Sequence, residues 1–473
     1  MSNAKNIARQ RIESLLDANS FVEIGGAITA RSTDFNLGKV DAAGDGVVTG
    51  YGLIEGKLVY VYSQDPETLN GSIGEMHAKK IIRIYQDAVK MGAPVIGCID
   101  CSGIRLQEAT DALNGFGELY AAKAKASGVI LSVDIVFGNC GGGMAVASSM
   151  SDFTFMSKDA KFYVTSPDAI DQNRSEKCDT SSADYVDAKS DAVDMIGTEA
   201  EVIAEARRLV SILPGNNEDE SSDICTDDVN RDCTGIELFG KDKKSIIKTI
   251  ADGGLFVETK ANYGKSVITG FIRLNGSCVG VVANAYGDKD KILLCPTCAT
   301  KAARFIKFCD AFSIPVLTLA EISGFASSKE AESRMAKAAA TLTAAYAESN
   351  VPKVTCVIGN VYGSAAVLMN AKSIGADFVY AWPGLDMGMM DPKAAVKIIY
   401  TEEIEKAEDK VKFIDEKTAE YKEAMCSVES AAKRGYVDTV IAPAETRKYV
   451  IAAFEMLYSK REELPYKKHS ALV

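Results

Sequence analysis

The order of apolar and polar residues along the 473-residue chain predicts the same series of elements twice. Each series has a β-hairpin, a helix, an apolar strand ending in a Ser-Gly turn, an alanine-rich helix, another strand, and a glycine-rich turn that opens a helix. The hairpin, first helix and two strands lie at 52–65, 74–92, 93–103 and 129–138 in the first series, and at 271–284, 300–313, 314–324 and 353–359 in the second. Strands that alternate with helices predict an α/β fold with largely parallel, buried strands.

Matching sequence blocks indicate that the second series is a copy of the first. In order along the chain they are "LLDANSFVE" with "TIADGGLFVE", "TGYGLIEGKLVYV" with "TGFIRLNGSCVGV", "APVIGCIDCSG" with "IPVLTLAEISG", and "FGNCGGGMAV" with "IGNVYGSAAV". The last two pairs share one offset of 221 residues. Such a repeat predicts a tandem duplication, with domains at 1–235 and 236–473.

The glycine-rich turns are the candidate catalytic feature of each copy. They follow neighbouring strands, and a helix that starts there has N–H groups without intrahelical partners. Gly103 from one turn and Gly142 or Gly143 from the next are therefore expected to donate to one developing oxyanion. Tight packing of strand against helix is the alternative interpretation, and the duplication of both turns favours the oxyanion site.

Composition and charge narrow the class of protein. Apolar residues make up 47% and charged residues 25% of the chain, as in soluble globular proteins. The net charge of −12 is concentrated in residues 168–232, which hold 18 acidic and 6 basic residues. This stretch is predicted to form solvated connectors around a short helix at 199–213. The absence of a basic surface argues against a nucleic-acid partner, and the absence of an apolar leader predicts a cytoplasmic protein.

Side-chain chemistry based on histidine or a metal is not favoured. His77 and His469 are the two histidines, and neither lies at a glycine turn, so His77 is expected to be a packing or surface residue. The pairs Cys98–Cys101 and Cys295–Cys298 are too far apart in sequence for a zinc ribbon, so no metal site is predicted. The twelve cysteines are expected to be reduced.

Long, ordered strings show a resemblance to a known family. They include "ARQRIESLLDANSFVE", "VVTGYGLIEGKLVYVYSQD", "GAPVIGCIDCSGIRLQE", "SDFTFMSKDAKFYVTSPDAI", "KAARFIKFCDAFSIPV", "VPKVTCVIGNVYGSAAVLM" and "YAWPGLDMGMMDPKAAVKIIY". With them the chain resembles the carboxyltransferase (β) subunits of biotin-dependent acyl-CoA carboxylases, and the related subunits of methylmalonyl-CoA decarboxylase and transcarboxylase. The resemblance implies two crotonase-like domains in tandem.

The resemblance also implies a division of labour between the halves. The N-terminal half would bind the acyl-CoA, with Gly103, Gly142 and Gly143 at the thioester oxygen. The C-terminal half would bind biotin, with Gly324 and the turn Gly363-Ser364-Ala365 at its ureido oxygen. Biotin would arrive on a separate carrier protein loaded by a biotin carboxylase subunit. The subunits would form a homo-oligomer, for which a hexamer is one arrangement.

Several residues depart from the family pattern. Ser102-Gly103-Ile104-Arg105 replaces a Gly-Gly-Ala-Arg turn, so Ser102, Ile104 and Arg105 are expected at the substrate. Ser364 replaces a glycine, and Val367 stands where relatives often have an aspartate that helps to select the acyl group.

Three functions follow from these residues. The first is carboxyl transfer in an acyl-CoA carboxylase. The second is the reverse flow in a biotin-dependent decarboxylase, with membrane subunits, or in a transcarboxylase. The third is a non-catalytic paralogue that assembles with an active homologue.

Overall fold

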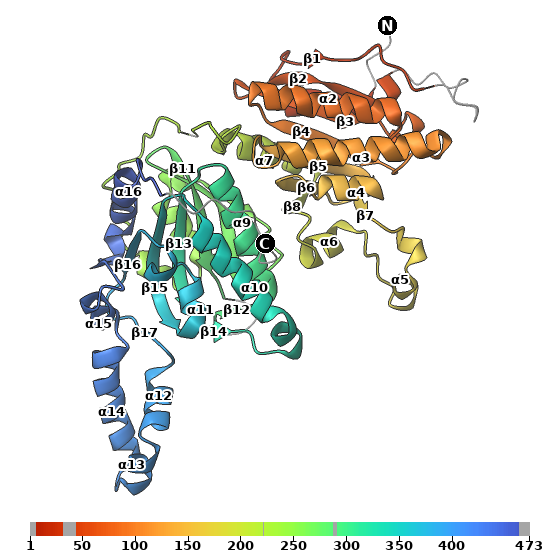
Figure 1. Ribbon diagram of the computed structural model, residues 1–473. Helices are drawn as coiled ribbons and strands as arrows, with labels where there is room; N and C mark the ends of the chain where they lie inside the picture. Colours follow the sequence, from red (N-terminus) through yellow and green to blue (C-terminus); the bar gives the residue numbers. More distant parts are fainter. Residues whose placement is uncertain (1–5, 32–43, 221, 287–290, 463–473) are drawn as a thin grey trace. The chain divides into compact units, whose positions relative to one another are not determined.

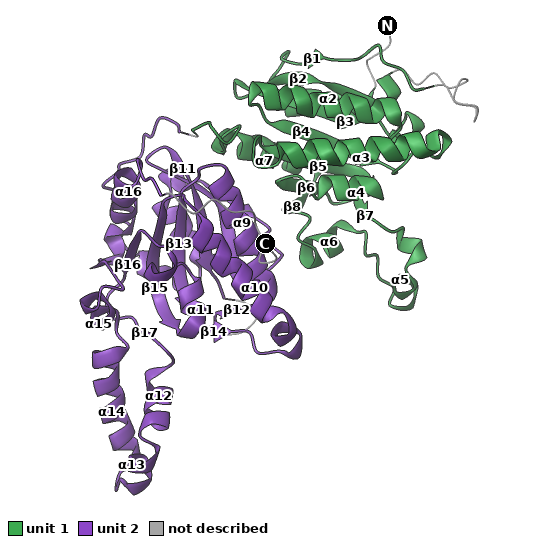
Figure 2. Cartoon of the chain, in the orientation of Figure 1, with its two compact units in different colours: residues 1–221 green, residues 222–473 purple. Residues whose placement is uncertain are grey.

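The computed structural model describes residues 6–31, 44–220, 222–286 and 291–462, which form two compact units, 1–221 and 222–473 (Figures 1 and 2). The strands of the first unit are β1 (Val22–Glu23), β2 (Val47–Ile54), β3 (Lys57–Gln64), β4 (Val95–Cys101), β5 (Ser132–Gly141), β6 (Phe153–Ser157), β7 (Lys161–Tyr163) and β8 (Met195–Gly197). Its helices are α1 (Ile7–Leu15), α2 (Glu75–Met91), α3 (Ala109–Ala126), α4 (Gly143–Ser148), α5 (Asp171–Ser175), α6 (Ala183–Lys189) and α7 (Glu199–Ile212).

The second unit has the same elements in the same order, with additions. Its strands are β9 (Phe256–Thr259), β10 (Val267–Leu274), β11 (Ser277–Asn284), β12 (Leu293–Leu294), β13 (Val316–Ile322), β14 (Gly324–Phe325), β15 (Lys353–Tyr362), β16 (Phe378–Ala381), β17 (Met387–Gly388) and β18 (Thr439–Val440). Its helices are α8 (Lys243–Ile250), α9 (Pro296–Ala311), α10 (Lys329–Glu348), α11 (Gly363–Leu368), α12 (Pro392–Ile399), α13 (Thr401–Lys406), α14 (Lys410–Met425), α15 (Val428–Lys433) and α16 (Thr446–Met456).

The two main sheets have matching topology. The first has the order β1-β2-β3-β4-β5-β6-β8 with β7 beside β5, and the second has β9-β10-β11-β13-β15-β16-β18 with β17 beside β15. In each sheet the first three strands are antiparallel and the rest are parallel. The predicted duplication and the predicted hairpins are therefore confirmed.

Local sequence signals account for the helices that cover the sheets. In α2 the buried side chains recur at helical spacing, from His77 through Ile81 and Ile84 to Ala88, and the helix ends at Gly92 with φ 62°. That positive φ is readily adopted by glycine, which lacks a Cβ atom. Helix α9 begins earlier than predicted, because Pro296 occupies its first turn and Cys295 is its N-cap.

Two sequence expectations need correction in the acidic region. Residues 171–191 were expected to be a solvated connector, but Ala183 and Val186 of α6 are buried in the core of the first unit. The boundary between the units lies at 221/222 rather than at 235. Residues 222–235 belong to the second unit because Ser222 pairs with Ser277 and the N–H of Cys233 donates to the carbonyl of Ala444 (2.7 Å).

The expectation of fully reduced cysteines is also wrong. Cys295 and Cys298 form a disulfide, since their positions at the start of α9 place the Cα atoms 5.1 Å apart, within the range a disulfide spans. The other cysteines are free thiols. Across the described ranges, no helix is both long and apolar enough to cross a membrane.

Candidate active site

The same irregularity in strand pairing precedes the glycine turns of both units. In the first, β4 and β5 pair at Ile99↔Val136 and next at Cys101↔Cys140, so β5 holds two extra residues. In the second, β13 and β15 pair at Ala320↔Val357 and next at Ile322↔Val361, with the same two extra residues. Such a bulge redirects the ends of the strands. It brings the turn after one strand beside the turn after the next.

In the first unit, the turn glycines differ in the hydrogen-bond partner of their backbone N–H groups. Gly103 has φ 113°, and its N–H points to the Sγ of Cys101 (3.3 Å), a weak acceptor. Gly142 has φ 60°, and its N–H donates to the carbonyl of Tyr163 (2.8 Å). Gly143 begins α4, so its N–H has no intrahelical partner. Gly142 therefore shapes the turn, and Gly143 is the residue whose N–H has no intrahelical partner.

The Cys101 thiol stays neutral beside this turn. Burial raises its pKa to about 12. A protonated Sγ can accept from the N–H of Gly103 and face its carbonyl oxygen at 3.5 Å. The sulfur thus fixes the turn without adding a negative charge to it.

The Arg105 side chain is structural in this unit. It is 1% exposed, and its guanidinium donates to Asp45 (2.5 Å), Glu108 (2.8 Å) and the carbonyl of Ser72 (2.7 Å). Because all these partners are internal, the side chain is not open to a substrate, contrary to the binding role expected from the sequence. Ile104 packs partly buried against the core, whereas Ser102 is exposed.

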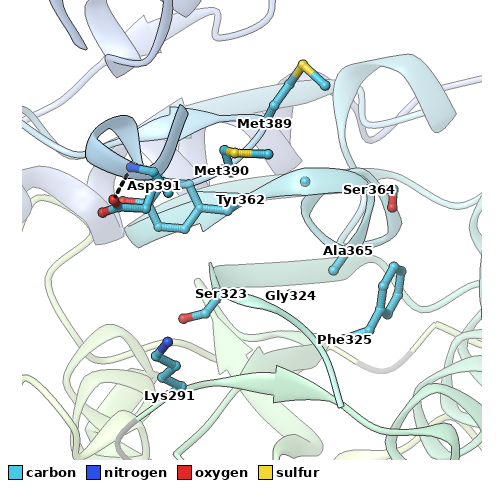
Figure 3. Close-up of a pocket in the computed structure, with 12 residues that line it drawn as sticks. Lys291, Ser323, Gly324, Phe325, Tyr362, Ser364, Ala365, Met389, Met390 and Asp391 are labelled. Atoms are coloured by element: carbon cyan, nitrogen blue, oxygen red, sulfur yellow. Dashed lines mark hydrogen bonds between the residues drawn. The ribbon is translucent and has the colours of Figure 1, made fainter. Parts of the chain in front are cut away.

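In the second unit, the predicted turn residues line one cavity of about 550 Å³ (Figure 3). Ser323, Gly324 and Phe325 form one side, and Gly363, Ser364 and Ala365 form the other. Gly324 has φ 145° and Gly363 has φ 68°. A Cβ atom at Gly324 would meet no heavy atom within 4 Å, so the open space reaches the backbone itself. Ser364 and Ala365 lie in the first turn of α11, where N–H groups lack intrahelical partners.

Several cavity residues had no signal in the sequence. Lys291 reaches toward Ser323, and Tyr362, Met389 and Met390 lie on the opposite side (Figure 3). The hydroxyl of Tyr362 donates to Asp386 (2.7 Å), and burial together with this carboxylate raises its pKa above the usual range. Only the position of Tyr362, directly before Gly363, could have suggested it.

Two residues considered from the sequence, Val367 and His77, do not lie at the open side of the glycine turns. Val367, the expected selector of the acyl group, is 40% exposed on α11 and does not line the cavity. His77 is fully buried, as one of the two expected alternatives, and burial lowers its pKa to about 3. Its Nδ1 lies 2.8 Å from the carbonyl of Asp45 and its Nε2 lies 3.2 Å from the Gln64 amide nitrogen. These contacts fit a neutral ring that packs rather than reacts. His469 lies outside the described residues.

Comparison with known proteins supports the family resemblance over nearly the whole length of the chain. Residues 1–472 match the carboxyl transferase domain family. The chain belongs to this family. It is 40% identical to the propionyl-CoA carboxylase beta chain of Roseobacter denitrificans, over 98% of this chain and 93% of that one. It is 36% identical to the methylmalonyl-CoA decarboxylase subunit alpha of Propionigenium modestum, over 99% and 93%.

A solved structure extends the similarity to the fold. The transcarboxylase 12S structure superposes on this carboxyl transferase with a TM-score of 0.93 at 35% identity, over 98% of this chain and 92% of that one. The tandem crotonase-like fold expected from the resemblance is thereby confirmed. So is the class of enzyme, a biotin-dependent carboxyltransferase.

Proposed function

We propose that this carboxyltransferase moves a carboxyl group between biotin on a separate carrier protein and a short-chain acyl-CoA. In this proposal the first unit binds the acyl-CoA and the second binds biotin. The observation that carries it is the cavity of the second unit, in which two glycine turns face one open space.

The residues of this cavity fit the ureido ring of biotin. The ring is small and neutral and has one carbonyl oxygen, which needs backbone donors rather than a charged partner. Ser364 and Ala365 would hold that oxygen with the free N–H groups of the first turn of α11. Gly324 would let the ring approach the opposite backbone, because no side chain fills that space. When bound, carboxylated biotin supplies the carboxyl group and a base.

The first unit would stabilise the enolate of the acyl-CoA. The negative charge of an enolate develops on the thioester oxygen, so donors aimed at that oxygen lower the barrier more than they favour substrate binding. Gly143 would donate its free N–H, and Gly103 would exchange the weak Cys101 sulfur for the oxyanion. Gly142 holds the turn through its bond to Tyr163. Loss of one such donor typically costs about 10²–10³ in rate.

The same proposal gives this chain the kinds of partner that its relatives have. The transcarboxylase 12S protein is described as a hexamer that binds methylmalonyl-CoA. We infer a homo-oligomer for this chain, with a biotin carrier and a biotin carboxylase subunit as partners. The decarboxylase relative from Propionigenium modestum supports the alternative of decarboxylation or transcarboxylation with the same residues. A non-catalytic paralogue is the remaining alternative.

The reverse half-reaction tests the proposal. Purified protein is mixed with biocytin and, separately, with malonyl-, methylmalonyl-, ethylmalonyl- and glutaconyl-CoA, and the decarboxylated acyl-CoA is measured. Turnover of one substrate that depends on biocytin supports the proposal and identifies an acyl group. An intact oligomer with no turnover on the whole panel would favour the non-catalytic paralogue.

A further inference from the structure

A carboxylate occupies the strand bulge in each unit, three residues before the glycine of the first turn, and it is buried in the first unit and partly buried in the second. Asp100 is the carboxylate on β4, and Glu321 is its counterpart on β13. The two residues are 221 positions apart, the offset of the glycine turns. They belong to neither turn, and the proposed mechanism does not use them.

In the first unit, the side chain of Asp100 links α1 and β5 to the bulge. Its carboxylate accepts from Arg11 of α1 (3.0 Å) and from the backbone N–H of Asn139 on β5 (3.1 Å). Gly138 makes room for it, since a Cβ there would lie 2.2 Å from its Oδ1. Asn139 is one of the extra residues of β5 and lies four positions before Gly143. The carboxylate therefore fixes the strand that delivers the free donor.

The backbone of Asp100 is held by a second contact. Its N–H donates to the side-chain oxygen of Gln64 (3.2 Å). The amide nitrogen of Gln64 lies against His77, so its oxygen is oriented toward Asp100. Gln64 is fully buried. The contacts from His77 through Gln64 to Asp100 therefore hold the end of β4 in place.

The second unit repeats the arrangement with a longer side chain. The N–H of Glu321 donates to the side-chain oxygen of Asn284 (3.2 Å), which corresponds to Gln64. A Cβ at Gly359 would lie 2.3 Å from the Glu321 carboxyl carbon, so Gly359 corresponds to Gly138. The Glu321 carboxylate pairs with Lys243 of α8 and accepts from the hydroxyl of Tyr286 (2.8 Å).

The additional methylene turns the second carboxylate toward the helix side of the bulge. There it borders a separate cavity of about 180 Å³, also lined by Lys241, Tyr286 and Trp382. Asp100 accepts a hydrogen bond from the neighbouring strand directly, whereas Glu321 anchors its own strand to α8 and to the end of β11. Each carboxylate still acts within one unit.

We propose that Asp100 and Glu321 are positioning residues, each of which sets the geometry of the turns in its own half. This inference rests on the proposed division of labour between the halves. Asp100 then governs the acyl-CoA site and Glu321 governs the biotin site. Neither residue touches the reacting atoms. A displacement of about 1 Å at a site of this kind can cost about 10²-fold in rate.

The experiment compares Asp100→Asn with Glu321→Gln, which keep side-chain size and remove the charge. Calorimetry measures the Kd of propionyl-CoA and of biocytin, and hydrogen exchange measures protection of residues 139–143 and 360–365. For Asp100→Asn we expect the Kd of propionyl-CoA to rise about tenfold or more, with faster exchange at 139–143 alone. For Glu321→Gln we expect the same changes for biocytin and for 360–365.

Asp134→Asn is the matched control. Asp134 is a buried carboxylate on β5, paired with Lys123 (3.0 Å), away from the bulge. It should lower the Tm without separating the two Kd values. Equal changes in the Kd of propionyl-CoA and of biocytin would overturn the positioning role. So would hydrogen exchange that becomes faster only in step with the fall in Tm, as in the control. If the wild type binds neither ligand, the proposed function fails, while the exchange pattern alone still decides whether each carboxylate fixes its own turns.

Discussion

At the scale of single residues, Gly142 is required for its backbone conformation more than for space. Gly142 has φ 60°, and a Cβ there would meet no heavy atom within 4 Å. A side chain would therefore fit sterically, but a β-branched residue strongly disfavours that φ. Substitution is expected to reorient the turn rather than to disrupt the core.

We predict that Gly142→Val abolishes biocytin-dependent decarboxylation while the oligomer stays intact, because the N–H of Gly143 would be displaced from the proposed thioester site. Activity assays and light scattering on the same sample measure both. Gly56→Val is the matched control, since Gly56 has φ 77°, equally open space and a place in the β2–β3 turn. Full activity in a folded Gly142→Val protein would refute the assignment.

His77 gives a prediction about stability and pH. Burial lowers its pKa to about 3 in the folded protein, below the ordinary 6.5, so the unfolded chain binds its proton first. Stability is therefore present above pH 6.5 and is lost as the pH falls below it, by up to about 1.4 kcal/mol per pH unit. Thermal unfolding of the wild type and of His77→Gln between pH 7.5 and pH 5 tests this.

The variant should show a flatter dependence of Tm on pH than the wild type. Asp45 contacts the same ring, and burial raises its pKa, which acts in the opposite direction. Because both proteins retain Asp45, their difference isolates the histidine. Parallel curves would show that His77 titrates normally.

At the scale of elements, the start of α9 combines a cap and a cross-link. Cys295 accepts from the N–H of Cys298 (3.2 Å) and is also bonded to its sulfur. The segment before it, β12, pairs with β14, which holds Gly324. The disulfide thus closes a short loop next to the proposed biotin cavity.

We predict that replacing both cysteines with serine costs about 2 kcal/mol or less, because the closed loop is short and serine retains an N-cap acceptor. Dithiothreitol should lower the Tm of the wild type by about 2–4 °C and leave that of the double variant unchanged. Alkylation followed by mass spectrometry counts the thiols. If all twelve cysteines of the unreduced protein were alkylated, the cross-link would be absent in solution.

At the scale of the whole molecule, the second unit carries a helical hairpin with little core of its own. Helices α12 and α14 pack against each other, and α14 buries no residue (Figure 1). Ile398 is 66% exposed, Ile399 is 56% exposed and Val411 is 67% exposed. Several exposed apolar side chains on one hairpin are typical of a protein interface.

We predict that Ile398→Glu together with Ile399→Glu shifts the proposed homo-oligomer toward smaller species, since each charge would have to be buried on assembly. Light scattering coupled to size exclusion measures the mass of the particles. Lys412→Glu on α14 provides a charge-changing control on the same hairpin. An unchanged mass at low micromolar concentration would exclude this face from the interface.

The sequence by itself determined the duplication, the hairpins, the strands and the positions of the glycine turns. These features depend on local periodicity and on residues close together in the chain, such as Gly363, Ser364 and Ala365. It also determined the family, because long strings match in one order. The proposed chemistry of backbone donors rests on the type of turn.

Only the tertiary structure decided which groups remain available. Arg105 stands in a motif, yet a long-range ion pair with Asp45 and a local one with Glu108 hold it in the interior. The N–H of Gly142 is taken by Tyr163, and Lys291 reaches the cavity from another segment. The bulges at Asp100 and Glu321 emerge only when strands distant in sequence pair. Such contacts join residues that no local pattern connects, so packing in three dimensions selects them.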